Sequence, residues 1–379
     1  MTFDRIATDL NPVSSESPIS TIEDILEDAR NGRPYILVDA EDRENEGDIC
    51  IPAQMATPDV VNFMARFGRG LICLAITGER SRQLRLPPMA AENGARNGTA
   101  FTVAIEAKDG ITTGISAHDR ARTIAVAIDQ TKGYDDIVSP GHVFPLVARD
   151  GGVLVRAGHT EAVVDISRMA GLYPAGVICE VMNDDGTMAR LPDLIKFAQT
   201  HGLKIGTIAD LIAYRRRTER FVDRVLEKPF ESQWGGQFRL FVYRNRLDQG
   251  EHIALVKHQP VPNMATLVRM HQLDVAADVL GASDGRAGLV EQAMTALAAY
   301  DGPAVMVMLR DLDPKVISNR FSADEAGTPQ PRGLRDYGVG AQILLDLGVR
   351  DMIALSDSKP KPAALEGYGL QIIDWKPLS

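Results

Sequence analysis

The chain has little cysteine, no long apolar run and no excess of basic residues. Its 379 residues include three cysteines, Cys50, Cys73 and Cys179, which stand far apart in apolar stretches. That spacing fits neither a disulfide framework nor a CxxC metal site, so buried free thiols are the simplest interpretation. No stretch approaches the roughly 18 apolar residues that span a bilayer, and the acidic N-terminal segment does not resemble a signal peptide. We therefore expect a cytoplasmic protein with no membrane partner.

The charge balance argues against another class of partner. The chain has 41 lysines and arginines against 51 aspartates and glutamates, a formal net charge of −10, which disfavours nucleic-acid binding. Hydrophobic residues make up 45% of the chain and charged residues 24%, as is ordinary for globular proteins. At about 150 residues per domain, the length predicts two domains with separate cores.

Apolar periodicity predicts the organisation of both domains. Residues 1–19 look like a flexible tail, and a capping box formed by Ser20 and Glu23 opens the first helix. Strands and helices then alternate to residue 217 with both hairpin-like and crossover connections, which favours an α+β domain with a mixed sheet. An arginine-rich helix leads into an expected linker at 218–229. A second, α/β domain is expected over 230–379.

An acidic loop is the most informative local feature. Six acids fall within residues 39–48, between expected strands at 35–38 and 49–53. Because strands hold both ends of this connection, its carboxylates must converge at nearly fixed positions. Such oxygens suit Mg²⁺, which binds through one or two carboxylates and keeps several waters. The alternative is a solvated turn, since most charge runs are plain surface.

A second segment has the features of an anion site. Residues 156–160, with the sequence RAGHT, stand where an expected strand at 152–156 turns into a helix. Gly158 permits close backbone approach, and the free N–H groups of a helix N-terminus favour an anion. Arg156 and Thr160 can add hydrogen bonds to it. We predict a phosphate site here, with a plain helix cap and a surface arginine as the alternative.

Two further side chains could move protons. His142 lies in the segment SPGHVFP at 139–145, whose prolines predict a rigid turn entering a strand. A fixed imidazole suits general acid or base catalysis near neutral pH, although a loop histidine without function is the alternative. Glu180 lies inside the apolar run 176–181. A carboxylate there is either paired with an arginine or available as a base.

Taken together, these segments resemble the 3,4-dihydroxy-2-butanone 4-phosphate synthases of riboflavin biosynthesis. The resemblance covers about residues 20–217 and is carried by DRENEGD at 42–48, TTG at 112–114, PGHVFP at 140–145, RAGHTEA at 156–162 and PAGVICE at 174–180. It implies conversion of D-ribulose 5-phosphate to 3,4-dihydroxy-2-butanone 4-phosphate and formate, with Mg²⁺ or Mn²⁺ as cofactor. It also implies a homodimer with its active site at the subunit interface.

The resemblance assigns a role to each candidate residue. The implied metal ligands are Glu44 and His159, and the implied catalytic residues are His142, Glu180 and Glu46. The residues implied to bind the substrate are Arg43, Glu44, Asp48, Thr113, Arg156, Ala157, Gly158, His159, Thr160 and Glu180. The reaction begins with proton removal beside a ketone, which needs a base and a cation to stabilise the oxyanion. Which catalytic residue moves which proton stays open.

The second domain resembles GTP cyclohydrolase II, through YRN at 243–245, LRDYGVGAQIL at 334–344 and LEGYGL at 365–370. That family holds a catalytic Zn²⁺ with three cysteines, whereas the matching positions here are Asp274, Gly285 and Ala287. The family's Arg-Gly-Ile-Gly segment reads PKVI at 314–317, and no cysteine follows Cys179. A thiolate zinc site therefore cannot form here, and Asp274 with His271 would hold a metal only weakly.

We accordingly expect a monofunctional synthase that contains no zinc and carries an inactive second domain. One alternative is a bifunctional enzyme that acts on GTP with a different metal or with none. The other is a second domain that binds a nucleotide or flavin, or that serves assembly.

Overall fold

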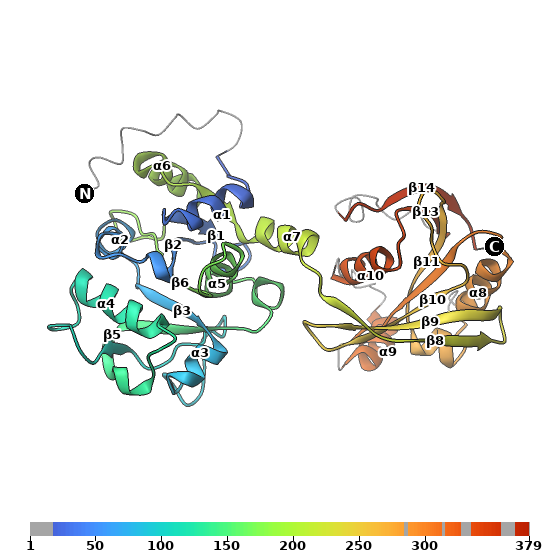
Figure 1. Ribbon diagram of the computed structural model, residues 1–379, viewed down its shortest axis with the longest axis horizontal. Coiled ribbons are helices and arrows are strands. Elements are labelled where there is room, and N and C mark those ends of the chain that lie inside the picture. The colour runs from blue at the N-terminus through green and yellow to red at the C-terminus, as the bar shows by residue number, and fades with distance from the viewer. Residues whose placement is uncertain (1–17, 284–286, 313–314, 327–334, 358–367, 379) are drawn as a thin grey trace. The chain divides into compact units, whose positions relative to one another are not determined.

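The chain forms two compact units, Met1–Arg215 and Arg216–Ser379, seen in the computed structural model of Figure 1. The structure describes residues 18–283, 287–312, 315–326, 335–357 and 368–378. The expected tail at 1–19 lies almost wholly outside these ranges, as do Gly285, Pro314 and the motif residues 334 and 365–367. Each unit combines one mixed sheet with helices, which confirms the predicted fold class.

The sheet of the first unit has seven strands in the order β4-β5-β3-β6-β2-β1-β7. Only the β3–β5 and β1–β7 pairs are parallel. The strand bounds are β1 Tyr35–Val38, β2 Gly47–Pro52, β3 Cys73–Thr77, β4 Ile105–Ala107, β5 Ile137–Ala148, β6 Ala175–Glu180 and β7 Ile205–Thr207. In this register Val38 pairs with Gly47, and Asp48 pairs with Glu180. The end of β1, the start of β2 and the end of β6 therefore meet at one end of the sheet.

Helices cover both faces of this sheet. They are α1 Ile22–Arg30, α2 Pro58–Phe63, α3 Gly78–Gln83, α4 Ala117–Ile128, α5 His159–Met169, α6 Leu191–His201 and α7 Ile208–Thr218. Short turns lie at Ala53–Met55, Met64–Gly68, Tyr134–Asp136 and Gly152–Leu154. Ile36, Ile49 and Leu74 join a core with α2, α4 and α6, whereas Leu37 and Cys50 join a second core with α1, α5 and α7. Burial on both faces explains why the strands read as nearly continuous apolar runs.

Two local expectations in the first unit are wrong. The cap of α1 is Thr21, whose side chain accepts from the Asp24 backbone N–H. The Ser20 N–H bonds the Ile205 carbonyl, so it is not available to the capping box expected of Ser20 and Glu23. The strand expected at 152–156 is instead a 3₁₀ turn over Gly152–Leu154. Gly152 has a φ of +63°, a left-handed conformation that suits a turn and not a strand. The helix expected at 161–172 begins two residues earlier, at His159, and ends at Met169.

The second unit is a mixed sheet in the order β14-β13-β11-β12-β10-β9-β8. The strands are β8 Val222–Ser232, β9 Gly236–Asn245, β10 Glu251–Val256, β11 Thr266–Gln272, β12 Ala304–Leu309, β13 Asp351–Leu355 and β14 Gln371–Lys376. The helices are α8 Leu289–Ala299, α9 Val316–Ala326 and α10 Arg335–Asp346, and a π-helical turn covers Val275–Val279. Apolar residues of α10 and α8 pack into two separate cores of this unit.

The prediction of a linker at 218–229 is wrong for most of that segment. The segment from Val222 onward is β8, which pairs with β9 from Val222 opposite Asn245 to Ser232 opposite Gly236. Pro229 and the charged residues around it hid this strand from sequence patterns. β8 lies at the edge of the sheet, where proline and charge are tolerated because one side of the strand has no ladder to complete.

The last turns of α7 are anchored in the first unit. Arg215 is 2% exposed, and its guanidinium donates to Asp165 at 2.6 Å and to the Gly151 carbonyl at 2.9 Å. This buried ion pair ties α7 to α5.

The three cysteines are free and buried, as expected.

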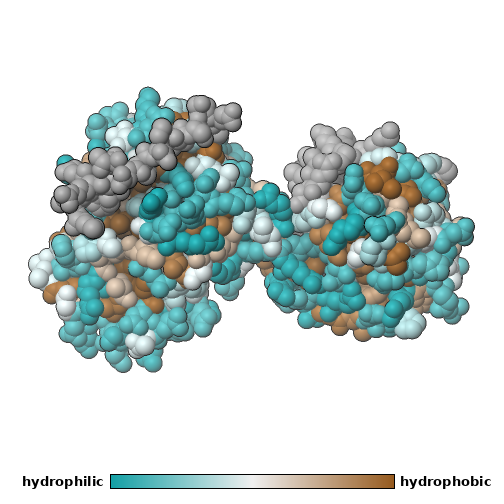
Figure 2. Space-filling view, turned by 45° about the horizontal axis from the view of Figure 1, so that its top comes forward, coloured by the Kyte–Doolittle hydropathy of each residue, from teal (hydrophilic) through white to brown (hydrophobic). Residues whose placement is uncertain are grey.

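The surface of each unit is mixed in character. In the view of Figure 2, hydrophobic patches lie within a larger hydrophilic surface. Among the described residues, no helix is long and apolar enough to cross a membrane.

Candidate active site

The acidic loop between β1 and β2 is organised by Asp39. Its carboxylate accepts hydrogen bonds from the backbone N–H groups of Glu44 (3.2 Å) and Glu46 (2.8 Å) and from the Arg43 guanidinium (2.7 Å). From outside the loop, Arg190 at the start of α6 donates to the carbonyls of Glu44 and Asn45. The loop is therefore held in one shape, and its other carboxylates are presented at fixed positions.

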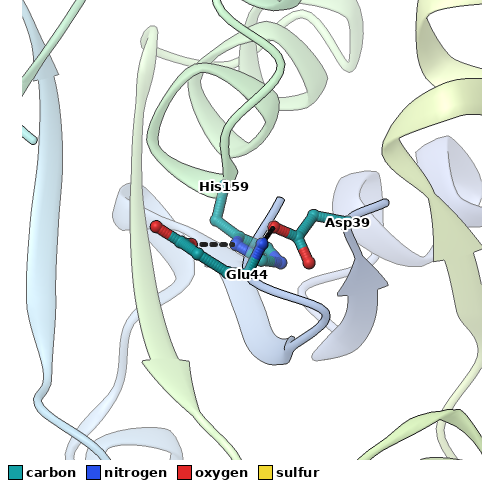
Figure 3. A group of neighbouring side chains, drawn as sticks. All are labelled: Asp39, Glu44 and His159. Atoms are coloured by element: carbon teal, nitrogen blue, oxygen red, sulfur yellow. Dashed lines mark hydrogen bonds and ion pairs between the residues drawn. The ribbon is translucent and has the colours of Figure 1, made fainter. Parts of the chain in front are cut away.

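Glu44 and His159 face one another at this loop (Figure 3). His159 Nε2 bonds the Leu37 carbonyl at 3.2 Å, so it carries the proton and leaves the Nδ1 lone pair free. Nδ1 lies 4.0 Å from Glu44 Oε2 and 3.7 Å from Asp48 Oδ1. Burial lowers the pKa of His159, which favours the neutral imidazole that can ligate a metal. In the described part of the chain, Asp39, Glu44 and His159 form a group whose potential ligand atoms lie within 4.8 Å of one another.

The RAGHT segment lies against the same loop. An added Cβ at Gly158 would lie 2.3 Å from Arg156 Nη1 and 3.0 Å from Arg43 Nη2, so a side chain there would displace both guanidiniums. Arg156 Nη1 also donates to Glu161, which is 1% exposed, at 2.6 Å. Thr160 is buried in the first turn of α5, next to Ala157 and Gly158. Two arginines and a helix N-terminus thus converge beside Glu44 and His159.

A group of carboxylates extends the site along the end of the sheet where β1, β2 and β6 meet. Asp48 on β2 is directly opposite Glu180 on β6. The pKa of Asp48 lies well above its usual range, mainly because the carboxyl is buried and secondly because the charge of Glu180 is close to it. The pKa of Glu46 is also raised, mainly by burial and secondly by the charge of Glu44. Glu180 itself accepts from the Leu71 backbone N–H at 2.7 Å, which fixes its carboxylate. Carboxyls with raised pKa values are suited to exchanging protons near neutral pH.

His142 and Thr113 belong to a second group. Glu106 pairs with Val138 and Ile105 with Val143, so residues 139–142 bulge out of β5. His142 Nδ1 bonds Glu106 Oε1, and Glu106 also lies against Gly114, where an added Cβ would meet its carboxylate. Asp119 holds this turn by accepting from the backbone N–H groups of Thr112 and Gly114. The exposed Thr113 lies between them.

The two groups lie apart on one copy of the chain. β5 is three strand spacings from β2, roughly 14 Å at the usual separation of neighbouring strands. Within the described residues, no hydrogen bond or ion pair links His142 or Thr113 with Glu44, Asp48 or His159. The candidate residues are thus brought together as two sets and not as one.

Four supporting residues had no predicted role: Asp39, which was expected only as one acid of the loop, and Asn97, Glu106 and Arg190. Asn97 donates to Glu44 Oε1 at 2.6 Å across 53 positions, and Glu106 reaches His142 across 36. Such distant partners leave no local pattern. Asp39 was the only one with a signal, because it directly follows β1.

Comparison with known proteins decides the family. A family model described as 3,4-dihydroxy-2-butanone 4-phosphate synthase matches residues 23–214, and one described as GTP cyclohydrolase II matches residues 223–377. The chain belongs to the 3,4-dihydroxy-2-butanone 4-phosphate synthase family. This synthase acts in riboflavin biosynthesis, where it converts D-ribulose 5-phosphate to 3,4-dihydroxy-2-butanone 4-phosphate and formate.

Relatives of the synthase span both units. A Photobacterium phosphoreum protein named 3,4-dihydroxy-2-butanone 4-phosphate synthase is 46% identical over 361 residues, which cover 94% of this chain and 99% of the relative. The riboflavin biosynthesis protein RibBA of a Synechocystis strain is 48% identical over 374 residues, covering 94% of this chain and 67% of the relative.

Solved structures of similar proteins support the same family assignment. RibBX from A. baumannii, described as a two-domain 3,4-dihydroxy-2-butanone 4-phosphate synthase, matches with a TM-score of 0.71 at 41% identity, covering 94% of this chain and 99% of that one. A synthase crystallised with two magnesium ions matches with a TM-score of 0.51 at 39% identity, covering 53% of this chain and 98% of that one.

In the second unit, the polar side chains near the positions expected to hold zinc in a cyclohydrolase bond to other side chains of the same unit. Asp274 caps the Val275–Val279 turn and accepts from Arg320 Nε at 3.0 Å. His271 Nε2 bonds Asp278 Oδ2 at 2.8 Å. Gly285 lies outside the described residues, and Ala287 has no ligand atom in its side chain.

Proposed function

We propose that Glu44 and His159 of the synthase hold a divalent cation, Mg²⁺ or Mn²⁺, at the active site. The observation that carries this proposal is the facing pair of donors, in which the Nδ1 lone pair of His159 lies 4.0 Å from Glu44 Oε2. The donor chemistry fits, because the His159 tautomer is set by Leu37 and carboxylate oxygens are preferred by Mg²⁺. When bound, the cation draws charge from the ketone oxygen of the sugar and so acidifies the neighbouring C–H bond.

The surrounding side chains would carry out the proton transfers. Glu46 and Glu180 lie beside the proposed cation site, and His142 is fixed by Glu106. The reaction removes a proton from the sugar, expels the 1-hydroxyl as water, shifts the carbon skeleton, adds a water molecule and releases carbon 4 as formate. These steps need several proton transfers, so a set of carboxyls and an imidazole suits them better than one acid–base pair.

We propose that Arg156, Thr160 and the N-terminus of α5 bind the substrate phosphate, with Arg43 and Asp48 contacting the sugar. Replacing Arg156 by alanine should remove about 1.5–3 kcal/mol of binding, a roughly 10- to 150-fold rise in the apparent KM for D-ribulose 5-phosphate. D-ribulose without the phosphate should be affected far less. Steady-state kinetics with both sugars, together with a melting curve, checks this.

Equal losses for the two sugars would contradict the phosphate role. They would show that Arg156 acts through its ion pair with the buried Glu161, and the melting temperature would then fall as well.

We further propose that the synthase is a homodimer in which His142 and Thr113 of one copy complete the Glu44–His159 site of the other. The separation of the two residue groups on one copy supports this, because two strands, β3 and β6, lie between the strands that carry His142 and Asp48. A two-fold interface buries the same patch on both copies, so each dimer would contain two shared sites.

Subunit mixing tests the shared site. Glu44→Gln and His142→Ala should each be inactive alone. After unfolding and refolding together, random pairing should restore about a quarter of wild-type activity, because half the dimers are mixed and each has one intact site. Refolded wild-type protein is the control. Absence of any recovery, with mixed dimers demonstrated by differently tagged subunits, would place both residues in the site of a single copy.

We also propose that the second unit is catalytically inactive. The absence of cysteine after Cys179 and the internal pairing of Asp274 and His271 support this. Relatives of the same two-unit length that are named only as the synthase support it further.

A further inference from the structure

Asn97 is a side chain that the proposed chemistry does not use, although it touches the centre of the site. It lies in the loop between α3 and β4, and its Nδ2 donates to Glu44 Oε1 at 2.6 Å. The other oxygen, Oε2, accepts from Arg43 at 2.7 Å and faces His159. The two oxygens of Glu44 are therefore held by different partners.

The same residue reaches the proposed phosphate site through its main chain. The Asn97 carbonyl accepts from Arg156 Nε at 3.3 Å and from Nη2 at 3.1 Å. Arg156 also donates to the Thr99 hydroxyl at 3.3 Å. The backbone of the loop is thus tied to Arg156, whereas only the side chain of Asn97 reaches Glu44. A substitution of Asn97 can remove the second contact and keep the first.

We propose that Asn97 is a positioning residue that orients the carboxylate of Glu44 so that Oε2 is presented to the cation shared with His159. This inference rests on the proposed function of Glu44 and His159. Hydrogen bonds that orient a ligating carboxylate commonly change metal affinity by about 10- to 100-fold. Without the Asn97 amide, Oε1 loses its donor and the carboxylate can rotate away from His159. The cation should then bind more weakly, whether or not substrate is present.

The direct test is titration of metal-free enzyme with Mn²⁺, with free Mn²⁺ followed by electron paramagnetic resonance in the absence of sugar. Asn97→Ala and the nearly isosteric Asn97→Leu should both raise the dissociation constant by about 10-fold or more. Glu44→Gln should abolish specific binding. Arg96→Ala is the matched control, because Arg96 is the neighbouring residue of the same loop with an exposed side chain. It should stay within about twofold of wild type.

The outcomes separate the two proposals. If Mn²⁺ binding does not depend on Glu44, the proposed cation site itself is wrong. If binding depends on Glu44 but both Asn97 variants match wild type, only the role of Asn97 is wrong. If Arg96→Ala weakens binding as much as Asn97→Ala, the effect belongs to the loop as a whole, which also overturns the role of the Asn97 amide.

A kinetic measurement distinguishes positioning from simple support of the loop. At saturating Mn²⁺, the KM of Asn97→Ala for D-ribulose 5-phosphate should stay within about twofold of wild type, because the Asn97 carbonyl still holds Arg156. The metal concentration needed for half-maximal activity should rise with the dissociation constant. A KM that rises as much as the metal requirement would show that the loop has left the site and would overturn the proposal.

Discussion

Glu44→Gln and His159→Ala should each lower formation of 3,4-dihydroxy-2-butanone 4-phosphate by orders of magnitude. A cation bound at this pair supplies several kcal/mol of stabilisation to the developing oxyanion, which corresponds to roughly a thousand-fold in rate. Glutamine keeps the size of Glu44 and its contact with Asn97 but replaces an anionic ligand by a neutral one. Formate release from D-ribulose 5-phosphate, measured with and without added Mg²⁺, checks the result.

Two controls make this prediction specific. Glu41→Gln changes an exposed acid of the same loop and should retain near-normal activity. His159 is only 4% exposed, so its replacement by alanine leaves a void and the fold must be checked by its melting temperature. Wild-type enzyme that kept near-normal turnover in excess EDTA would rule out the metal role of the pair.

The full-length protein should hold no zinc in its second unit and should not open the guanine ring of GTP. In a zinc cyclohydrolase the metal lowers the pKa of its bound water and polarises the carbon under attack, so loss of the ligands removes the nucleophile itself. Here Asp274 and His271 are committed to Arg320 and Asp278. The expected loss of GTP turnover is therefore complete and not partial.

The measurement must separate zinc in the two units, because Glu44 and His159 could also bind it. Elemental analysis should therefore use Glu44→Gln, followed by an assay of formate from GTP with no sugar present. A cysteine-containing GTP cyclohydrolase II assayed in parallel shows that the conditions are adequate. One zinc per chain in Glu44→Gln, with GTP turnover that a chelator abolishes, would show that the second unit is active.

Local sequence patterns predicted the parts of this molecule that depend on neighbouring residues. The alternation of apolar runs predicted a mixed-sheet first unit and an α/β second unit, and the acids between two strands predicted an acidic loop fixed at both ends. The apolar helical pattern after the RAGHT segment predicted α5, although its start was predicted two residues late. Each of these features depends on residues within a few positions of one another, so periodicity and turn chemistry are sufficient to find them.

The rest depends on contacts between distant segments. The bond between Asn97 and Glu44 and the bond between His142 and Glu106 arise only once the sheet has formed. The cap of α1 illustrates a finer limit, because Ser20–Glu23 and Thr21–Asp24 have the same spacing. The Ser20 N–H that the first pair would need is bonded to Ile205, a residue far away in the sequence.

The edge strand β8 has a further consequence for the solution behaviour of the protein. Glu227, Lys228 and Pro229 are exposed in its middle, on the border of a seven-stranded sheet. An open edge is a template on which another chain can add a strand, and charge and proline are the usual barriers to such growth. Pro229 offers no N–H, and the adjacent charges would have to be desolvated by an incoming strand. The residues that led to the prediction of a linker in place of β8 thus protect the second unit from edge-to-edge aggregation.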